Sequence, residues 1–89
     1  MAKSKKNWYT VAYFTAEGKP HSAHWNFVHV RMELEILRRD LEHEMSMDYI
    51  RRGAHAAAVW PGRLAEWDAL HSDIKPLFYI HEDGTVSET

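Results

Sequence analysis

The spacing of hydrophobic and polar residues predicts one long helix in the middle of the chain. Over Met32–Gly53, apolar residues recur every three to four positions, which is the spacing of one helical face. The stripe expected to face the core consists of Leu34, Leu37, Leu41, Met45 and Asp48. Gly53, which follows two arginines, is a suitable end for this helix. A break at Ser46, which would then cap a second short helix, is the alternative.

The opposite face of the same predicted helix is also apolar. It carries Met32, Ile36, His43, Met47 and Ile50. A helix on the surface of a small domain normally presents polar residues to solvent. Apolar residues on both sides therefore predict that something covers the second face, either a segment of the same chain, such as Pro61–His71, or another molecule.

Before the helix, the pattern changes to the period of two that is typical of strands. Trp8–Phe14 is rich in β-branched and aromatic residues, and His21–Val30 follows it after a turn at residues 16–20. We expect these two segments to form an antiparallel hairpin. Trp25 and Phe27 share one side of the second strand, and we expect that side to pack against the helix.

After the helix, the signals are shorter. Trp60-Pro61-Gly62 predicts a stop or turn, and Pro61–His71 predicts a short helix because proline fits the first helical turn. Leu77–Glu82 predicts a third strand, and Thr85–Glu88 a short edge strand after a tight turn. The predicted fold class is α+β: a small antiparallel sheet of three to four strands, with one long helix packed on it and a short second helix.

Composition narrows the possible functions. Eighty-nine residues predict a single domain over 1–89, with residues 1–6 forming a flexible basic tail. The chain contains no cysteine, which excludes disulfides, thiolate metal sites and cysteine nucleophiles. We see neither a signal peptide nor a long apolar run, so we expect a cytoplasmic protein that does not enter a membrane. No cofactor motif is present, and we expect no cofactor.

The charges are distributed unevenly. The first 31 residues carry five basic side chains and one acidic side chain, whereas the remainder carries six basic and twelve acidic ones. A lysine-rich tail and a solvated helix surface explain this difference simply. The alternative is that an aromatic, basic face of the sheet binds RNA or single-stranded DNA, with bases stacked on tyrosines and phosphates held by lysines. The residues of that face would be Lys3, Lys5, Lys6, Tyr9 and Tyr13.

Seven histidines raise the question of catalysis, since imidazole is the usual acid–base group near neutral pH. Their spacing matches no metal motif, and we expect no metal site. A small metal-independent nuclease-like toxin is a further alternative, with His21 and His24 as acid and base and Arg31 holding phosphate. Nothing in the spacing requires this chemistry, so we expect no enzymatic activity.

The function that the sequence favours is binding to another protein, as a regulator, adaptor or inhibitor. Methionine adapts its shape to a partner surface, and tryptophan is enriched among interface anchors. Small phage or mobile-element modulators of host proteins have this general character, although that is analogy only. The partner could also be a second copy of the chain, giving a homodimer. The predicted protein-binding residues are Met32, Ile36, Arg39, His43, Met47, Ile50, Trp60 and Trp67.

Overall fold

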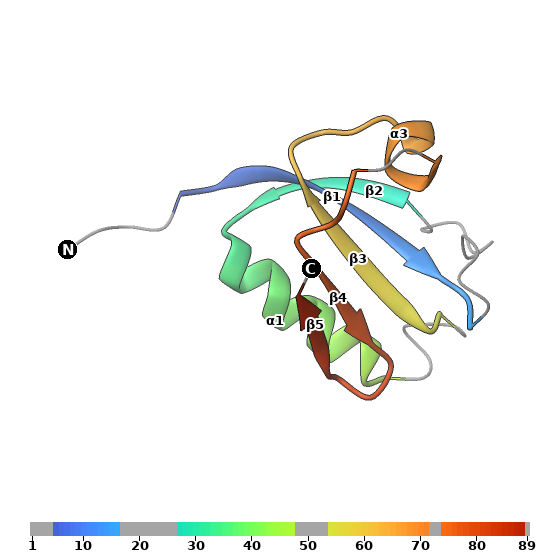
Figure 1. Ribbon diagram of the computed structural model, residues 1–89. Coiled ribbons are helices and arrows are strands. Elements are labelled where there is room, and N and C mark those ends of the chain that lie inside the picture. Colours follow the sequence, from blue (N-terminus) through green and yellow to red (C-terminus); the bar gives the residue numbers. More distant parts are fainter. Residues whose placement is uncertain (1–4, 17–26, 48–53, 72–73, 89) are drawn as a thin grey trace.

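The fold is α+β, as predicted, with one helix packed on one antiparallel sheet (Figure 1). The computed structural model describes residues 5–16, 27–47, 54–71 and 74–88. Within them the sheet has five strands in the order β2-β1-β3-β4-β5, rather than three to four, and every neighbouring pair is antiparallel. The elements are β1 (Asn7–Phe14), β2 (Phe27–Met32), α1 (Leu34–Met45), β3 (Ala56–Pro61), α3 (Glu66–His71), β4 (Phe78–His81) and β5 (Val86–Glu88).

The strand that the sequence did not predict is β3, which lies at the centre of the sheet between β1 and β4. Its alanines have a high helix propensity, and its last residue is Pro61. Ala57, Ala58 and Val59 are nevertheless fully buried, because both faces of the sheet are covered at these three residues. Pro61 is tolerated because it stands at the end of the strand, where a missing backbone donor costs little.

The central helix is much shorter than predicted. Met32 belongs to β2, where it pairs with Asn7, so α1 begins only at Leu34. It ends at Met45, and the following Ser46 closes it, with its backbone N–H directed to the carbonyls of Glu42 and His43. The Ser46 hydroxyl also donates to the His43 carbonyl at 2.7 Å. The break at Ser46 is therefore correct, and the predicted continuation over 48–53 lies outside the described residues.

The main core lies between α1 and the sheet. The predicted core stripe is confirmed at Leu37, Leu41 and Met45, which are buried, while Leu34 is half-buried and Asp48 lies outside the described residues. The sheet side chains that meet this stripe come from β1, β3 and β4 and include Tyr9, Val11, Val59, Phe78 and Ile80. This core covers one face of the sheet, and the residues on the opposite face form a second, smaller cluster.

The predicted hairpin is confirmed, because β1 pairs with β2 in antiparallel register. Phe27, however, does not face α1. It lies opposite Ala12 and packs with Ala58 and Trp60 on the side of the sheet away from α1, which we call the helix-free face because the long helix does not cover it. The pleat alternates side chains strictly between faces, so the register places Phe27 with the even-numbered residues of β1. Trp25 lies outside the described residues.

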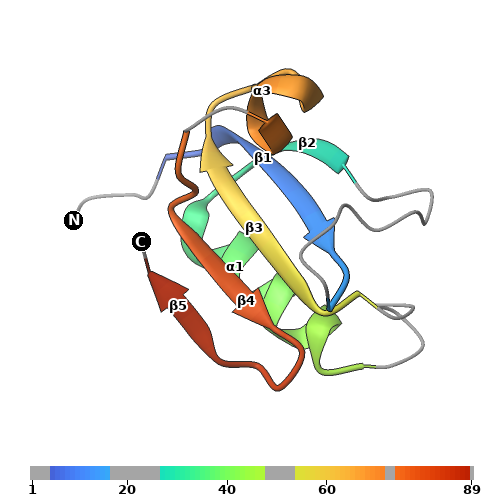
Figure 2. The ribbon, with the colours of Figure 1, turned by 45° about the vertical axis from the view of Figure 1, so that its right-hand side comes forward.

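Short elements cover only part of the helix-free face (Figure 2). The second helix is confirmed over the last six residues of its predicted range, as α3, and Ala69 of α3 packs with Ala12, Ala58 and Trp60. The predicted third strand and edge strand are confirmed as β4 and β5. Gly84 joins them with a φ of 87°, a conformation that suits glycine. At the other end of this face, no helix or strand of the described residues covers the sheet.

Candidate functional site

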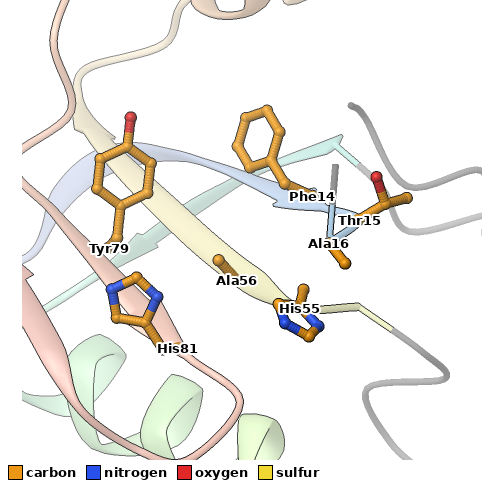
Figure 3. A pocket seen from close by; sticks show the side chains of 7 residues that line it. All are labelled: Phe14, Thr15, Ala16, His55, Ala56, Tyr79 and His81. Atoms are coloured by element: carbon orange, nitrogen blue, oxygen red, sulfur yellow. The ribbon is translucent and has the colours of Figure 1, made fainter. Parts of the chain in front are cut away.

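The candidate site is a hollow of about 370 Å³ on the open end of the helix-free face (Figure 3). It lies where β1 ends, β3 begins and β4 ends, so three segments distant in sequence contribute to it. Its described lining consists of Phe14, Thr15, Ala16, His55, Ala56, Tyr79 and His81.

The strand register explains why the surface is hollowed here. Phe14, Ala56 and His81 lie opposite one another across three adjacent strands, so a methyl group stands between two rings. In the neighbouring row, Ala58 pairs with Ala12 on one side and with Tyr79 on the other. Small side chains on the central strand and large ones beside it produce a depression with an apolar floor.

Two histidines stand at the rim, and each has a hydrogen-bonding or ionic partner. His55 Nδ1 lies 3.1 Å from Glu82 Oε2, and His81 Nε2 lies 2.8 Å from Ser87 Oγ. The His55 backbone is fixed between β1 and β4, since its N–H donates to Phe14 and its carbonyl accepts from Glu82. These contacts orient both imidazoles at the edge of the sheet.

Tyr79 and His81 form one wall of the hollow. They are two residues apart on β4, and their rings are stacked with centroids 6.5 Å apart and an interplanar angle of 23°. Figure 3 shows both rings on the same side of the strand, with His55 and Phe14 across from them. Such a wall offers aromatic surface together with polar atoms at its edges.

The chemistry of this lining suits binding. An apolar floor with a few convergent polar groups is the usual composition of a ligand or side-chain pocket. Within the part of the chain that the structure describes, no three His, Asp or Glu side chains are grouped so that they could hold a metal ion. Glu82, the carboxylate next to His55, is engaged with that imidazole.

The predicted protein-binding residues of the helix do not all belong to α1. Ile36 is 44% exposed on α1, and Arg39 and His43 are exposed on the same helix. Met32 instead lies half-buried on β2 and packs against the core. Met47 is half-buried beyond the end of the helix, and Ile50 lies outside the described residues.

The two predicted tryptophan anchors occupy different environments. Trp60 is only 2% exposed, and its indole N–H donates to the Ile74 carbonyl at 2.9 Å. It is therefore a core residue, and the prediction that Trp60 anchors an interface is wrong. Trp67 is 66% exposed on α3, which packs on the sheet face opposite α1. Trp67 and Ile36 consequently belong to different surfaces.

The two tyrosines that were predicted to stack on bases face the core beneath α1. Tyr9 is 7% exposed and packs in the core beneath α1. Tyr13 lies on the same face, and its hydroxyl donates to Glu44 Oε1 at 3.0 Å. Burial, together with the nearby Glu44 carboxylate, raises the pKa of Tyr13 well above its usual value. Of the predicted lysines, Lys5 and Lys6 are exposed, and Lys3 lies outside the described residues.

The residues proposed for nuclease chemistry are only partly described. His21 and His24 lie outside the described residues, while Arg31 is exposed on β2. The neighbouring His29 has a structural partner, since its Nε2 donates to the Leu64 carbonyl at 2.6 Å.

Sequence reasoning missed Phe14, Tyr79 and His81 as residues of one site. The period-two spacing of Tyr79 and His81 was a usable signal, because it places both on the same face of a strand. Their juxtaposition with Phe14 depends on β3, which the sequence pattern did not reveal.

Scans of protein-family models, curated proteins and solved structures each returned no match to this chain. In the described part of the chain, none of the helices has the length and apolar character needed to cross a membrane.

Proposed function

We propose that this protein is a non-enzymatic binding module that acts as a regulator, adaptor or inhibitor of a larger protein. It would do so by receiving a side chain of that partner in the hollow. The observation that carries the proposal is the open, alanine-floored depression between Phe14 and His81 on the helix-free face. An apolar side chain with a polar end would match the floor and the two rim imidazoles.

The state of the aromatic residues supports a binding role for this face. Phe14, Phe27 and Tyr79 are half-buried on the same side of the sheet, next to the fully buried alanines 12 and 58. Aromatic surface left open beside a concave floor is typical of an anchor pocket for a partner.

The outer face of α1 offers less apolar surface. Ile36 stands there among charged residues, and Arg38 is engaged with Glu42 and Glu88 at 3.6 and 3.7 Å. A single exposed isoleucine on a charged helix is ordinary for a small domain. The helix-free face is therefore the better candidate, although the sequence pattern had favoured the helix.

A pair of matched substitutions tests the proposal. Ala56→Arg places a long cation in the hollow, and Ile36→Arg places the same group on α1. Wild type and both variants, each verified as folded by circular dichroism, are used to capture partners from a lysate of the source organism. Quantitative mass spectrometry and titration calorimetry with the purified partner then measure binding.

We expect Ala56→Arg to weaken binding by about 30-fold or more, which corresponds to losing one hot-spot contact of at least about 2 kcal/mol. Ile36→Arg should bind as wild type does. A loss confined to Ile36→Arg would place the interface on α1 instead. Failure of wild type to retain any protein in a saturable manner would contradict the proposed function.

A further inference from the structure

The helix-free face has a second distinctive region at its other end, where β1 begins and β3 ends. The Arg63 guanidinium carbon lies 4.7 Å from the centre of the Trp8 ring, which is a cation–π arrangement. Trp8 is 41% exposed, so part of this residue remains accessible although the Arg63 guanidinium lies over one face of the indole. This pair lies on the side of the sheet away from α1, like the other even-numbered residues of β1.

The backbone on both sides of Arg63 is held in place by hydrogen bonds. The Gly62 N–H donates to the Trp8 carbonyl at 2.8 Å, and Gly62 adopts a φ of 81°. The buried Thr10 hydroxyl donates to the Gly62 carbonyl at 2.8 Å and accepts from the Leu64 N–H at 2.9 Å. The Leu64 carbonyl is bound in turn by His29. Arg63 therefore projects over Trp8 from a fixed turn.

Further cations lie around this pair. Arg31 is the direct cross-strand partner of Trp8, so both side chains share one face. Lys5 and Lys6 immediately precede β1 and are exposed. The carboxylates of the described residues belong mainly to α1, α3 and the β4–β5 hairpin, with Glu33 at the start of α1. Lys5, Lys6, Arg31 and Arg63 thus lie at the end of the sheet where β1 begins, an end that Glu33 and Glu88 share.

We propose that this end of the sheet binds single-stranded nucleic acid, with a base stacked on Trp8 and phosphates contacted by Arg63, Arg31 and the two lysines. An arginine stacked on an aromatic ring keeps its N–H groups directed outward in its own plane, where they can bind phosphate oxygens in pairs. Aromatic side chains beside a positively charged track are the common features of single-strand binding surfaces. The aromatic residue is Trp8, in place of the buried Tyr9 and the half-buried Tyr13.

The exposed indole favours a nucleic acid over an acidic peptide. Cations alone would attract both ligands, whereas a flat ring beside an oriented guanidinium provides a stacking surface that a chain of carboxylates does not use. This proposal is independent of the hollow at the other end of the face, so the failure of either proposal leaves the other standing.

The test measures binding of a fluorescein-labelled oligothymidylate to the full chain by anisotropy across a salt series. For single strands the logarithm of affinity falls with the logarithm of salt by about 0.7 per phosphate neutralised. We expect Arg31→Gln and Arg63→Gln each to reduce that slope by about 0.7. Trp8→Leu should weaken binding between about 5- and 150-fold at one salt concentration, with the slope preserved.

Two further variants keep the test specific. Arg39→Gln removes an exposed cation from α1, on the other side of the sheet, and should bind as wild type does. Arg63→Lys retains the charge without the planar group, and should keep the salt slope while losing affinity. Circular dichroism verifies that each variant is folded.

Three results would overturn the proposal. The first is no saturable binding of the oligonucleotide at low salt. The second is equal weakening by Arg39→Gln and Arg63→Gln, which would indicate a diffuse charge effect. The third is displacement of the oligonucleotide by polyglutamate of matched charge as effectively as by an unlabelled oligonucleotide, which would indicate a site for acidic peptides.

Discussion

The Thr10 hydroxyl offers a sharp test of how the sheet positions its functional face. Thr10 is fully buried on β1, and its hydroxyl bridges Gly62 and Leu64 on the connection from β3 to α3. Thr10→Val keeps the shape of the side chain but removes both hydrogen bonds. The Gly62 carbonyl and the Leu64 N–H then lose a partner in a partly buried position.

The size of the effect follows from these two bonds. A typical hydrogen bond contributes about 0.5–1.5 kcal/mol net, so the pair amounts to about 1–3 kcal/mol. In a domain of this size, 1 kcal/mol shifts the melting temperature by about 4–8 °C, so we expect a fall of roughly 5–20 °C. Arg63 should also move relative to Trp8, because its flanking residues lose two of the four hydrogen bonds that hold them.

Thermal and urea unfolding of Thr10→Val and Thr10→Ser provide the assay. Thr10→Ser keeps the hydroxyl and loses one methyl group, which costs roughly 1 kcal/mol through lost burial. The valine variant should be the less stable of the two. If it were as stable as the serine variant or more so, the Thr10 bridge would not be what fixes this connection, and the positioning of Arg63 would need another cause.

Three other predictions concern the core, a turn and the alkaline limit. Leu41→Ala should lower the free energy of unfolding by about 2–5 kcal/mol in urea titrations, because Leu41 is buried between α1 and the sheet; no change would place the core elsewhere. Gly84→Ala should cost about 1 kcal/mol at its positive φ, and Gly84→Asn less, by the same measurement. The phenol of Tyr13 has a raised pKa in the folded protein, so above about pH 10 only the unfolded state gives up this proton and stability falls as pH rises. Tyr13→Phe should flatten that alkaline decline, and an unchanged decline would contradict the assignment.

The helix illustrates what periodicity alone can predict. Leu37, Leu41 and Met45 occupy the core stripe because a three-to-four spacing places them on one side of a helix in any context. The start of the helix depends on something else, the pairing of Met32 with Asn7 on the neighbouring strand. A single-segment pattern contains no information about a partner 25 positions away, so the predicted boundary was too early.

The central strand shows a stronger effect of tertiary context. Ala56, Ala57 and Ala58 favour helix when considered locally, yet Ala56 stands in the sheet between Phe14 and His81, and Ala58 packs in one cluster with Trp60. Because β3 is the strand that brings β1 and β4 together, the hollow could not be located without it.

The face assignments in β1 depended on the same missing strand. The sequence shows that Trp8 and Tyr9 lie on opposite faces of β1. It does not show whether the even- or the odd-numbered residues face α1. The sheet turns Tyr9 and Tyr13 toward the core and leaves Trp8 exposed, which moves the candidate aromatic surface by one residue. The lysines at the start of β1 were recognisable as basic, while the contribution of Arg63 required the turn at Gly62.

The most direct test of the proposed binding role is site-specific photo-crosslinking in cells of the source organism. A photoreactive phenylalanine analogue replaces Tyr79 at the wall of the hollow, and in a matched strain it replaces Ile36 on α1. We predict that the probe at position 79 crosslinks to one defined protein and that the probe at position 36 does not. Crosslinking from position 36 alone, or no protein adduct from position 79, would contradict the claim that the helix-free face receives a partner.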